Sequence, residues 1–217
     1  MNKRKLIATG TVILILGCGF AAAQNRNINF DLLQAARAGS ETSVRSLLDQ
    51  GANPNSRNRL GDTPLNVAAR NGKAALGQAL VERGADVNLP NLARVTPLMS
   101  AAFGGHVEVL RVLLANKADA SPVDRVQKTA MVYAAGQGCT ACVEALLDAG
   151  VEANRRYAND ATALMWAAAY GKIDTVRLLL ARGADAAARD DRGKTALAIA
   201  VEEKQEAVAE LLRGGAR

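Results

Sequence analysis

The sequence predicts an all-α fold in which short helix pairs stack into a solenoid, and three observations lead to that prediction. Hydrophobic residues make up 49% of the 217 residues but aromatic residues only 3%, so alanine and leucine must build most of the core. Small side chains of this kind suit closely packed helices, whereas a β-sandwich is enriched in β-branched and aromatic residues. The other two observations are a sequence period of 33 residues and helix boundary signals that recur with that period.

The period runs through the chain without an insertion. Threonine, alanine and leucine each return every 33 residues, and they keep a fixed offset from one another. A repeat of this length holds one small unit that cannot bury its apolar surface alone, so neighbouring units must stack. The residues in register are Thr63, Thr96, Thr129, Thr162 and Thr195, then Ala68, Ala101, Ala134, Ala167 and Ala200, then Leu80, Leu113, Leu146, Leu179 and Leu212.

Residues 63–84 show what one unit contains. Thr63 can cap a helix with its hydroxyl group, and Pro64 suits the first helical turn. Apolar residues at helical spacing follow, and Gly72 ends this first helix. A second apolar helix runs to Gly84, after which a polar stretch leads into the next unit.

These residues resemble the ankyrin repeat. Thr63-Pro64-Leu65 and Thr96-Pro97-Leu98 are similar to its Thr-Pro-Leu-His element, and Gly105-His106 is similar to the start of its second helix. The resemblance covers residues 28–217 and implies an ankyrin solenoid of helix-turn-helix units with hairpin-like tips. We expect an N-terminal capping repeat at 24–57, central repeats at 58–90, 91–123, 124–156 and 157–189, and a C-terminal capping repeat at 190–217.

The repeats depart from the family pattern at the histidine of that element. In the family this histidine ties neighbouring units together by hydrogen bonds, so we expect weaker hydrogen bonding between units here. The residues that stand in its place are Asn66, Met99, Val132, Met165 and Ala198.

Residues 1–23 are predicted to be a secretory signal peptide. A short basic start is followed by the apolar residues 6–17 and by Ala21-Ala22-Ala23, which suits cleavage after Ala23. The mature protein is then expected in the bacterial periplasm or outside the cell. One alternative is an uncleaved membrane anchor, and another is a lipid anchor at Cys18.

The charge balance gives no reason to expect a nucleic-acid ligand. The whole chain has a net charge of +6, of which Lys3, Arg4 and Lys5 in the predicted signal peptide supply half. The remaining basic excess is small and scattered along the sequence, whereas nucleic-acid binding requires a concentrated basic patch.

A protein is the expected partner, and the resemblance implies docking on a concave face formed by the tips and first helices. Aromatic anchors surrounded by charge are typical of binding hot spots. Tyr133 and Trp166 align with apolar positions, which favours a core role, whereas Phe103 and Tyr170 align with exposed positions, which favours binding. The predicted partner-binding residues are Arg59, Leu60, Arg70, Asn71, Leu92, Val95, Phe103, Arg125, Lys128, Tyr133, Gln137, Asn159, Trp166, Tyr170 and Arg192, with Asp62 expected on the same tips.

Cys139-Thr140-Ala141-Cys142 is the one motif with chemistry of its own. It falls at the start of a second helix, where backbone amides lower the pKa of a thiol, and an oxidising compartment would close it as a disulfide. An inert staple, two unbonded thiols, and a redox or metal role are the alternatives. A metal site with His106 would lack a fourth ligand, and His106 also matches the glycine-histidine pair of the family.

The chain offers little for catalysis. His106 is its single histidine, which leaves one candidate base for any Ser-His-Asp or Cys-His arrangement, and no glycine-rich phosphate loop follows a strand. We therefore expect a non-catalytic protein-binding module without a cofactor or metal. The alternatives are a redox-responsive protein that uses Cys139 and Cys142, and an immunity-type inhibitor or host-directed effector.

Overall fold

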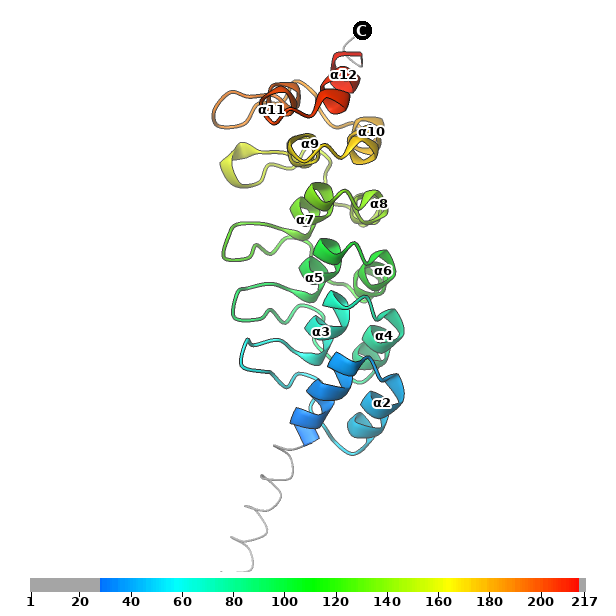
Figure 1. The fold of residues 1–217 in the computed structure, drawn as a ribbon. Coiled ribbons are helices and arrows are strands. Elements are labelled where there is room, and N and C mark those ends of the chain that lie inside the picture. Colours follow the sequence, from blue (N-terminus) through cyan, green and yellow to red (C-terminus); the bar gives the residue numbers. More distant parts are fainter. Residues whose placement is uncertain (1–27, 215–217) are drawn as a thin grey trace, which may run out of the picture.

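The computed structural model describes residues 28–214, and it confirms the all-α solenoid. Helix pairs stack along one axis, with loops that project to one side of the stack (Figure 1). Within the described residues the regular structure is entirely helical. The predicted signal peptide and Cys18 lie outside this range.

Each unit contributes an inner helix, next to the projecting loop, and an outer helix on the opposite side of the stack (Figure 1). The inner helices are a segment at 28–38 and α3 (Pro64–Arg70), α5 (Pro97–Gly104), α7 (Ala130–Gln137), α9 (Ala163–Ala169) and α11 (Ala196–Glu202). The outer helices are α2 (Glu41–Asp49), α4 (Ala74–Glu82), α6 (Val107–Ala115), α8 (Thr140–Asp148), α10 (Ile173–Ala181) and α12 (Glu206–Gly214). We call the projecting loops the tips; they comprise residues 56–62, 89–95, 122–128, 155–161 and 188–194.

The threonine register marks the start of each inner helix from α3 to α11. Each threonine has an extended backbone, and its hydroxyl accepts a hydrogen bond from the backbone N–H three residues later. This bond satisfies one of the free amide groups at a helix start, which is why the residue returns in every unit. Gly105 and Gly138 end α5 and α7 in the left-handed conformation that glycine adopts without strain.

One continuous core runs along the stack, and it follows the predicted registers. The alanines of the inner helices are fully buried, so adjacent backbones can approach closely, and the leucines of the outer helices fill the space between pairs. The alanines are Ala68, Ala101, Ala134, Ala167 and Ala200, and the leucines are Leu80, Leu113, Leu146, Leu179 and Leu212.

Hydrogen bonds between units compensate in part for the missing histidine. Asn66, which stands in its place in one unit, donates from Nδ2 to the carbonyl of Val95 in the next unit at 3.4 Å. In the turns that follow the outer helices, Asn88 Oδ1 accepts the N–H of Asp119 at 2.8 Å, and similar bonds link Asn55 with Asp86 and Asn154 with Asp185.

No helix of the described part of the chain is both long enough and apolar enough to cross a membrane.

Candidate protein-binding surface

The tips are stiff loops built around one side chain each. In the tip at 89–95, Asn91 Oδ1 accepts the backbone N–H groups of Ala93 and Val95 at 2.9 and 3.0 Å. Side chains that hydrogen-bond the backbone in this way replace a strand ladder and fix the loop. The equivalent residues in three other tips are Asn58, Asp124 and Asp190.

The tip at 155–161 is the exception. Tyr157 stands where the other tips have Asn or Asp, and the loop instead forms the 3-10 turn η1 (Ala158–Asp160). Asn159 and Asp160 adopt left-handed backbone conformations there.

The tips are joined along the stack by backbone hydrogen bonds, such as Leu92 N–H to the Leu60 carbonyl at 3.0 Å.

The expectation that Asp62 is exposed on its tip was wrong. Its side chain is only 1% exposed, and it accepts hydrogen bonds from Arg70 and Asn91, both at 2.8 Å. Burial raises the pKa of Asp62, but the hydrogen bonds from Arg70 and Asn91 and the charge of Arg70 outweigh burial and hold the pKa below its ordinary value. Asp62 therefore connects two tips and is not available to a partner.

An aromatic cluster spans three inner helices at the centre of the stack. Phe103 of α5 packs edge-on against Tyr133 of α7 at a centroid distance of 5.4 Å. Trp166 of α9 and Tyr170, the C-cap residue of that helix, stack at 6.2 Å, and Lys128 Nζ lies 4.9 Å from the centre of the Trp166 ring. A cation at this distance is attracted to the ring face. These side chains line a hollow of about 280 Å³.

Exposure separates the four aromatic residues as the alignment of the repeats predicted. Phe103 and Tyr170 are 56% and 52% exposed, whereas Tyr133 and Trp166 are half-buried and pack against the core. The Tyr133 hydroxyl donates to Asp124; burial raises the pKa of Tyr133, and the hydrogen bond and charge of Asp124 raise it further. The hydroxyl therefore stays protonated and holds the ring in place. Tyr133 and Trp166 both line the hollow as well, so each packs against the core and also contributes to the surface that a partner could contact.

A second hollow of about 340 Å³ lies against Trp166, toward the C-terminal end of the stack. Its lining includes Asn159, Met165, Arg192 and Ile199. Trp166 thus forms a wall shared by two hollows.

Exposed large hydrophobic side chains among the described residues gather on one surface. All of them lie on tips or inner helices, and the outer helices have none. We call the tips and inner helices together the tip surface, and the outer helices with their closing turns the outer surface. The exposed residues are Phe30, Leu60, Leu92, Phe103, Val126, Tyr170 and Val201.

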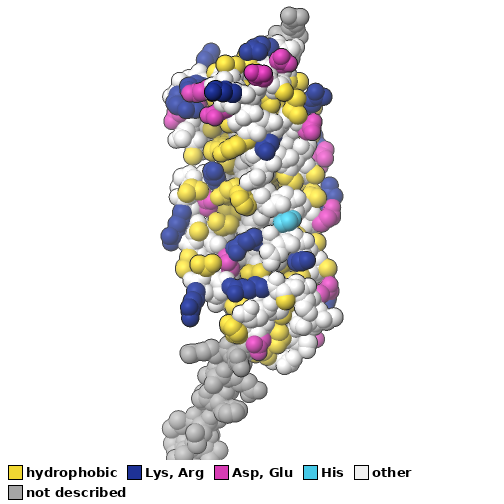
Figure 2. All heavy atoms as spheres, in the orientation of Figure 1, with side chains coloured by type: hydrophobic (Ala, Val, Ile, Leu, Met, Phe, Trp, Pro, Cys, Tyr) yellow, Lys and Arg dark blue, Asp and Glu magenta, His cyan; other side chains and the backbone are white. Residues whose placement is uncertain are grey.

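Charge differs between the two surfaces. Figure 2 shows Lys and Arg side chains along the edge formed by the tips, and Asp and Glu side chains interspersed with Lys and Arg along the opposite edge. On the outer surface, arginines form ion pairs with carboxylates of the adjoining unit, such as Arg182 with Asp148 at 2.7 Å and with Glu144 at 2.9 Å.

The predicted binding residues divide into exposed and structural ones. Arg70 and Arg192 are exposed but pair with Asp62 and Asp190, and Val95 packs against the core, so these three stabilise the tips. Asn71 is the C-cap of α3 and is exposed, and Tyr133, Trp166 and Lys128 line the central hollow. The remaining predicted residues are exposed on the tip surface; they are Arg59, Leu60, Leu92, Phe103, Arg125, Gln137, Asn159 and Tyr170.

Sequence reasoning missed Val126 and Arg94, which the structure places in the open on the tips. Val126 is 66% exposed and stands two periods after Leu60, so the repeat register could have identified it. Arg94 stands one period after Gly61 and three periods before Gly193, and all three have a left-handed backbone, so the repeat register could have placed Arg94 at the turn of its tip.

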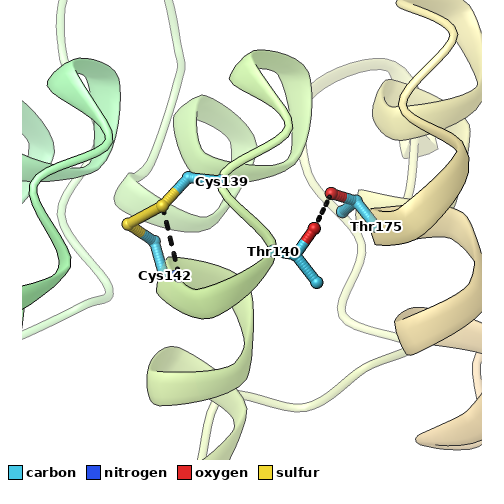
Figure 3. Close-up of a disulfide and its surroundings, with 4 residues drawn as sticks. All are labelled: Cys139, Thr140, Cys142 and Thr175. Atoms are coloured by element: carbon cyan, nitrogen blue, oxygen red, sulfur yellow. Dashed lines mark hydrogen bonds between the residues drawn. A yellow bond between two sulfur atoms is a disulfide. The ribbon is translucent and has the colours of Figure 1, made fainter.

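The structure joins Cys139 and Cys142 in a disulfide on the outer surface, at the start of α8 (Figure 3). Cys139 is the N-cap residue, and its sulfur accepts the N–H of Cys142 at 3.3 Å. Cys142 is fully buried. On the other side of the helix, the Thr140 hydroxyl makes a 3.0 Å hydrogen bond with Thr175 of α10 (Figure 3).

Comparison with known proteins agrees with this architecture. The family profile described as "Ankyrin repeats (3 copies)" matches residues 10–91, 32–124, 78–157 and 131–217. Among solved structures, the crystal structure of the ankyrin repeat protein EF0377 is similar at a TM-score of 0.77 and 29% identity, covering 84% of this chain and 96% of that one. No curated protein matches the chain.

The matches span the repeats found by the 33-residue period, and the described helices follow the same units. The chain therefore belongs to the ankyrin-repeat family and carries a protein–protein interaction module built from its repeats.

Proposed function

We propose that this chain binds a protein partner through its tip surface, the part of the repeats that the family resemblance implies as a concave binding face. The observation that carries the proposal is the one-sided distribution of exposed large hydrophobic side chains. Contiguous exposed apolar side chains mark interaction sites, and the buried centre of an interface is where aromatic residues contribute most.

Phe103 and Tyr170 are the proposed anchors. Both are about half exposed, and both border the hollow whose other walls are Tyr133 and Trp166. A partner side chain that enters this hollow would bury apolar surface on three inner helices at once. The hollow needs little rearrangement, because the hydrogen bond between Tyr133 and Asp124 and the packing of the core hold its walls.

Affinity capture from the native envelope fraction tests this proposal. Wild type is compared with a Phe103→Ala/Tyr170→Ala variant, and with a control variant, Arg111→Ala/Arg177→Ala, that changes exposed side chains of the outer surface. All three must keep the same helical circular dichroism. We expect a partner that is captured by wild type and the control but lost with the aromatic variant; equal capture by all three would contradict the proposal.

We also propose that the protein is exported before it acts, because of the signal-like residues 1–23. Intact mass of the protein purified from cells tests this. A chain that begins at Gln24 supports cleavage after Ala23, and a lipid-modified chain that begins at Cys18 supports the anchored alternative. A full-length mass would contradict both forms of processing; a full-length chain in the membrane fraction would support the uncleaved anchor, and a full-length chain in the cytoplasm would contradict export.

A thiol–disulfide role for Cys139 and Cys142 is the second candidate function, favoured by the disulfide that joins them at a helix start. Cys139 is only partly buried, so a reductant can approach the bond, whereas Cys142 is enclosed. Partner capture with oxidised protein, with reduced protein and with Cys139→Ser tests this role. Unchanged capture in all three leaves the disulfide as a structural staple.

A further inference from the structure

We infer that the ligand of the tip surface is an acidic segment of a protein, bound in an extended conformation along the tips of three consecutive units, at 56–62, 89–95 and 122–128. This inference rests on the proposed function and names the chemistry of its partner. It comes from a comparison of how arginine side chains are used on the two surfaces of the molecule.

Arginines on these three tips are not neutralised. Arg57, Arg59, Arg94 and Arg125 are all exposed, and their side chains make no ion pair or hydrogen bond with the residues that the structure describes. The carboxylates of the same tips do not balance them, because Asp62 and Asp124 are 1% and 2% exposed and already accept hydrogen bonds within the tips.

The outer surface shows that the chain can neutralise its arginines. Arg45, Arg83, Arg111 and Arg182 each reach a carboxylate, and three of these four bridge to a neighbouring unit. The tip arginines stand in the same 33-residue repeat without such partners. A row of uncompensated guanidinium groups attracts anions and favours carboxylate ligands, which they can bind with two parallel hydrogen bonds.

Apolar side chains on the same tips favour a protein over a nucleic acid. Leu60, Leu92 and Val126 are 64%, 56% and 66% exposed, and each lies on a tip that also carries one of the unpaired arginines. A phosphate backbone has no complementary group for aliphatic side chains, whereas a peptide can present acidic and apolar side chains together. Alternating guanidinium and aliphatic groups therefore match an acidic peptide with apolar residues between its acids.

The spacing of the tips sets the expected spacing of the acids. The three tips follow one another along the stack (Figure 1), joined by the bond from Leu92 N–H to the Leu60 carbonyl and from Arg125 N–H to the Ala93 carbonyl. Packed helices lie about 8–10 Å apart. A chain in the extended polyproline II conformation advances about 3.1 Å per residue with three residues per turn, so side chains three residues apart point to the same side. One acid about every three residues would therefore meet one tip after another.

Selection of peptides tests this inference. A library of random dodecapeptides is displayed and selected on the immobilised full-length chain, and selected peptides are synthesised to measure their affinity for variants. The test variant is Arg59→Glu/Arg125→Glu, and the control is Arg111→Glu/Arg177→Glu, which makes the same change of charge on the outer surface. We expect selected peptides to be rich in Asp and Glu, and to lose about tenfold or more in affinity with the test variant and little with the control.

Three results would overturn the inference: no enrichment of peptides, enrichment without an excess of acids, or equal losses with both charge variants. A single-stranded oligouridylate probe that binds as tightly as the peptides would replace the acidic segment with a nucleic acid. The Phe103→Ala/Tyr170→Ala variant separates the proposed binding surface from the proposed ligand. If it abolishes peptide binding while Arg59→Glu/Arg125→Glu does not, binding at the tip surface is supported and the acidic ligand is contradicted. If neither variant weakens binding, both proposals are contradicted.

Discussion

The tip surface and the outer surface are built from the same repeated unit, yet they use polar and apolar side chains in opposite ways. On the outer surface several arginines form ion pairs with carboxylates of a neighbouring unit, and no large hydrophobic side chain of the described residues is exposed there. On the tip surface several arginines are unpaired and several large hydrophobic side chains are exposed. Both surfaces are built from the same repeat and stack in the same way. Stacking of the repeats therefore does not explain why charges are paired on one surface and unpaired on the other. The difference supports the proposal that the outer surface stabilises the solenoid and that the tip surface binds a partner.

The largest expected effect on stability comes from Asp62, a buried tip carboxylate that pairs with Arg70. Asp62→Asn removes the charge that accepts from Arg70 and Asn91, and we expect it to lower the free energy of unfolding by about 1–3 kcal/mol. Urea denaturation measures this loss. Asp191→Asn, at an exposed carboxylate of another tip, is the matched control and should change stability little. Equal losses of stability with the two substitutions would contradict the claim that buried Asp62 stabilises the fold and exposed Asp191 does not.

The same carboxylate predicts how that loss depends on pH. The folded-state pKa of Asp62 is lowered from its ordinary 3.8, so its contribution to stability is present above that value and is lost as pH falls through the folded pKa. The difference between wild type and Asp62→Asn should therefore be constant between about pH 7 and pH 5 and shrink below about pH 4. Thermal unfolding across this range measures the difference, and a gap that widens in acid would contradict the assignment.

Reduction of the disulfide should have a smaller effect. The bond closes a loop of sequence separation 3, so the constraint on the unfolded chain is worth at most about 2 kcal/mol. Urea denaturation with and without a phosphine reductant measures this, and Cys139→Ser should behave like reduced protein because serine also caps a helix well. A larger loss, or loss of partner capture, would show that the outer surface does more than hold the solenoid together.

The smallest effects should separate the two classes of arginine. Arg83→Ala breaks an exposed ion pair with Asp49 between units, and we expect a loss in the free energy of unfolding below about 1 kcal/mol. Arg125→Ala breaks no such contact and should leave stability unchanged while weakening binding. Urea denaturation measures both variants. If Arg125→Ala destabilised the fold as much as Arg83→Ala, the claim that tip arginines do not contribute to stability would be contradicted.

The sequence was sufficient to predict the fold, because the threonine that begins the inner helix recurs five times, so the loss of another signal in one unit does not hide the repeat. Thr63 and its successors could be identified as caps, and Phe103 and Tyr170 as exposed, by alignment of the chain with itself. Burial of Asp62 could not be predicted in this way, since no other unit has an acid at that position and its partner Asn91 lies 29 residues away. The pairing of Arg83 with Asp49 likewise depends on side chains brought together across units, 34 residues apart in the sequence.

The most direct test of the central claim places a photo-crosslinking amino acid at two positions of one repeat, Val126 on its tip and Ala141 on its outer helix α8. Both positions are exposed, so neither substitution should disturb the core. After irradiation in the native envelope fraction, the account predicts a covalent adduct with a protein partner from position 126 and none from position 141. An adduct from position 141, with none from position 126, would contradict it.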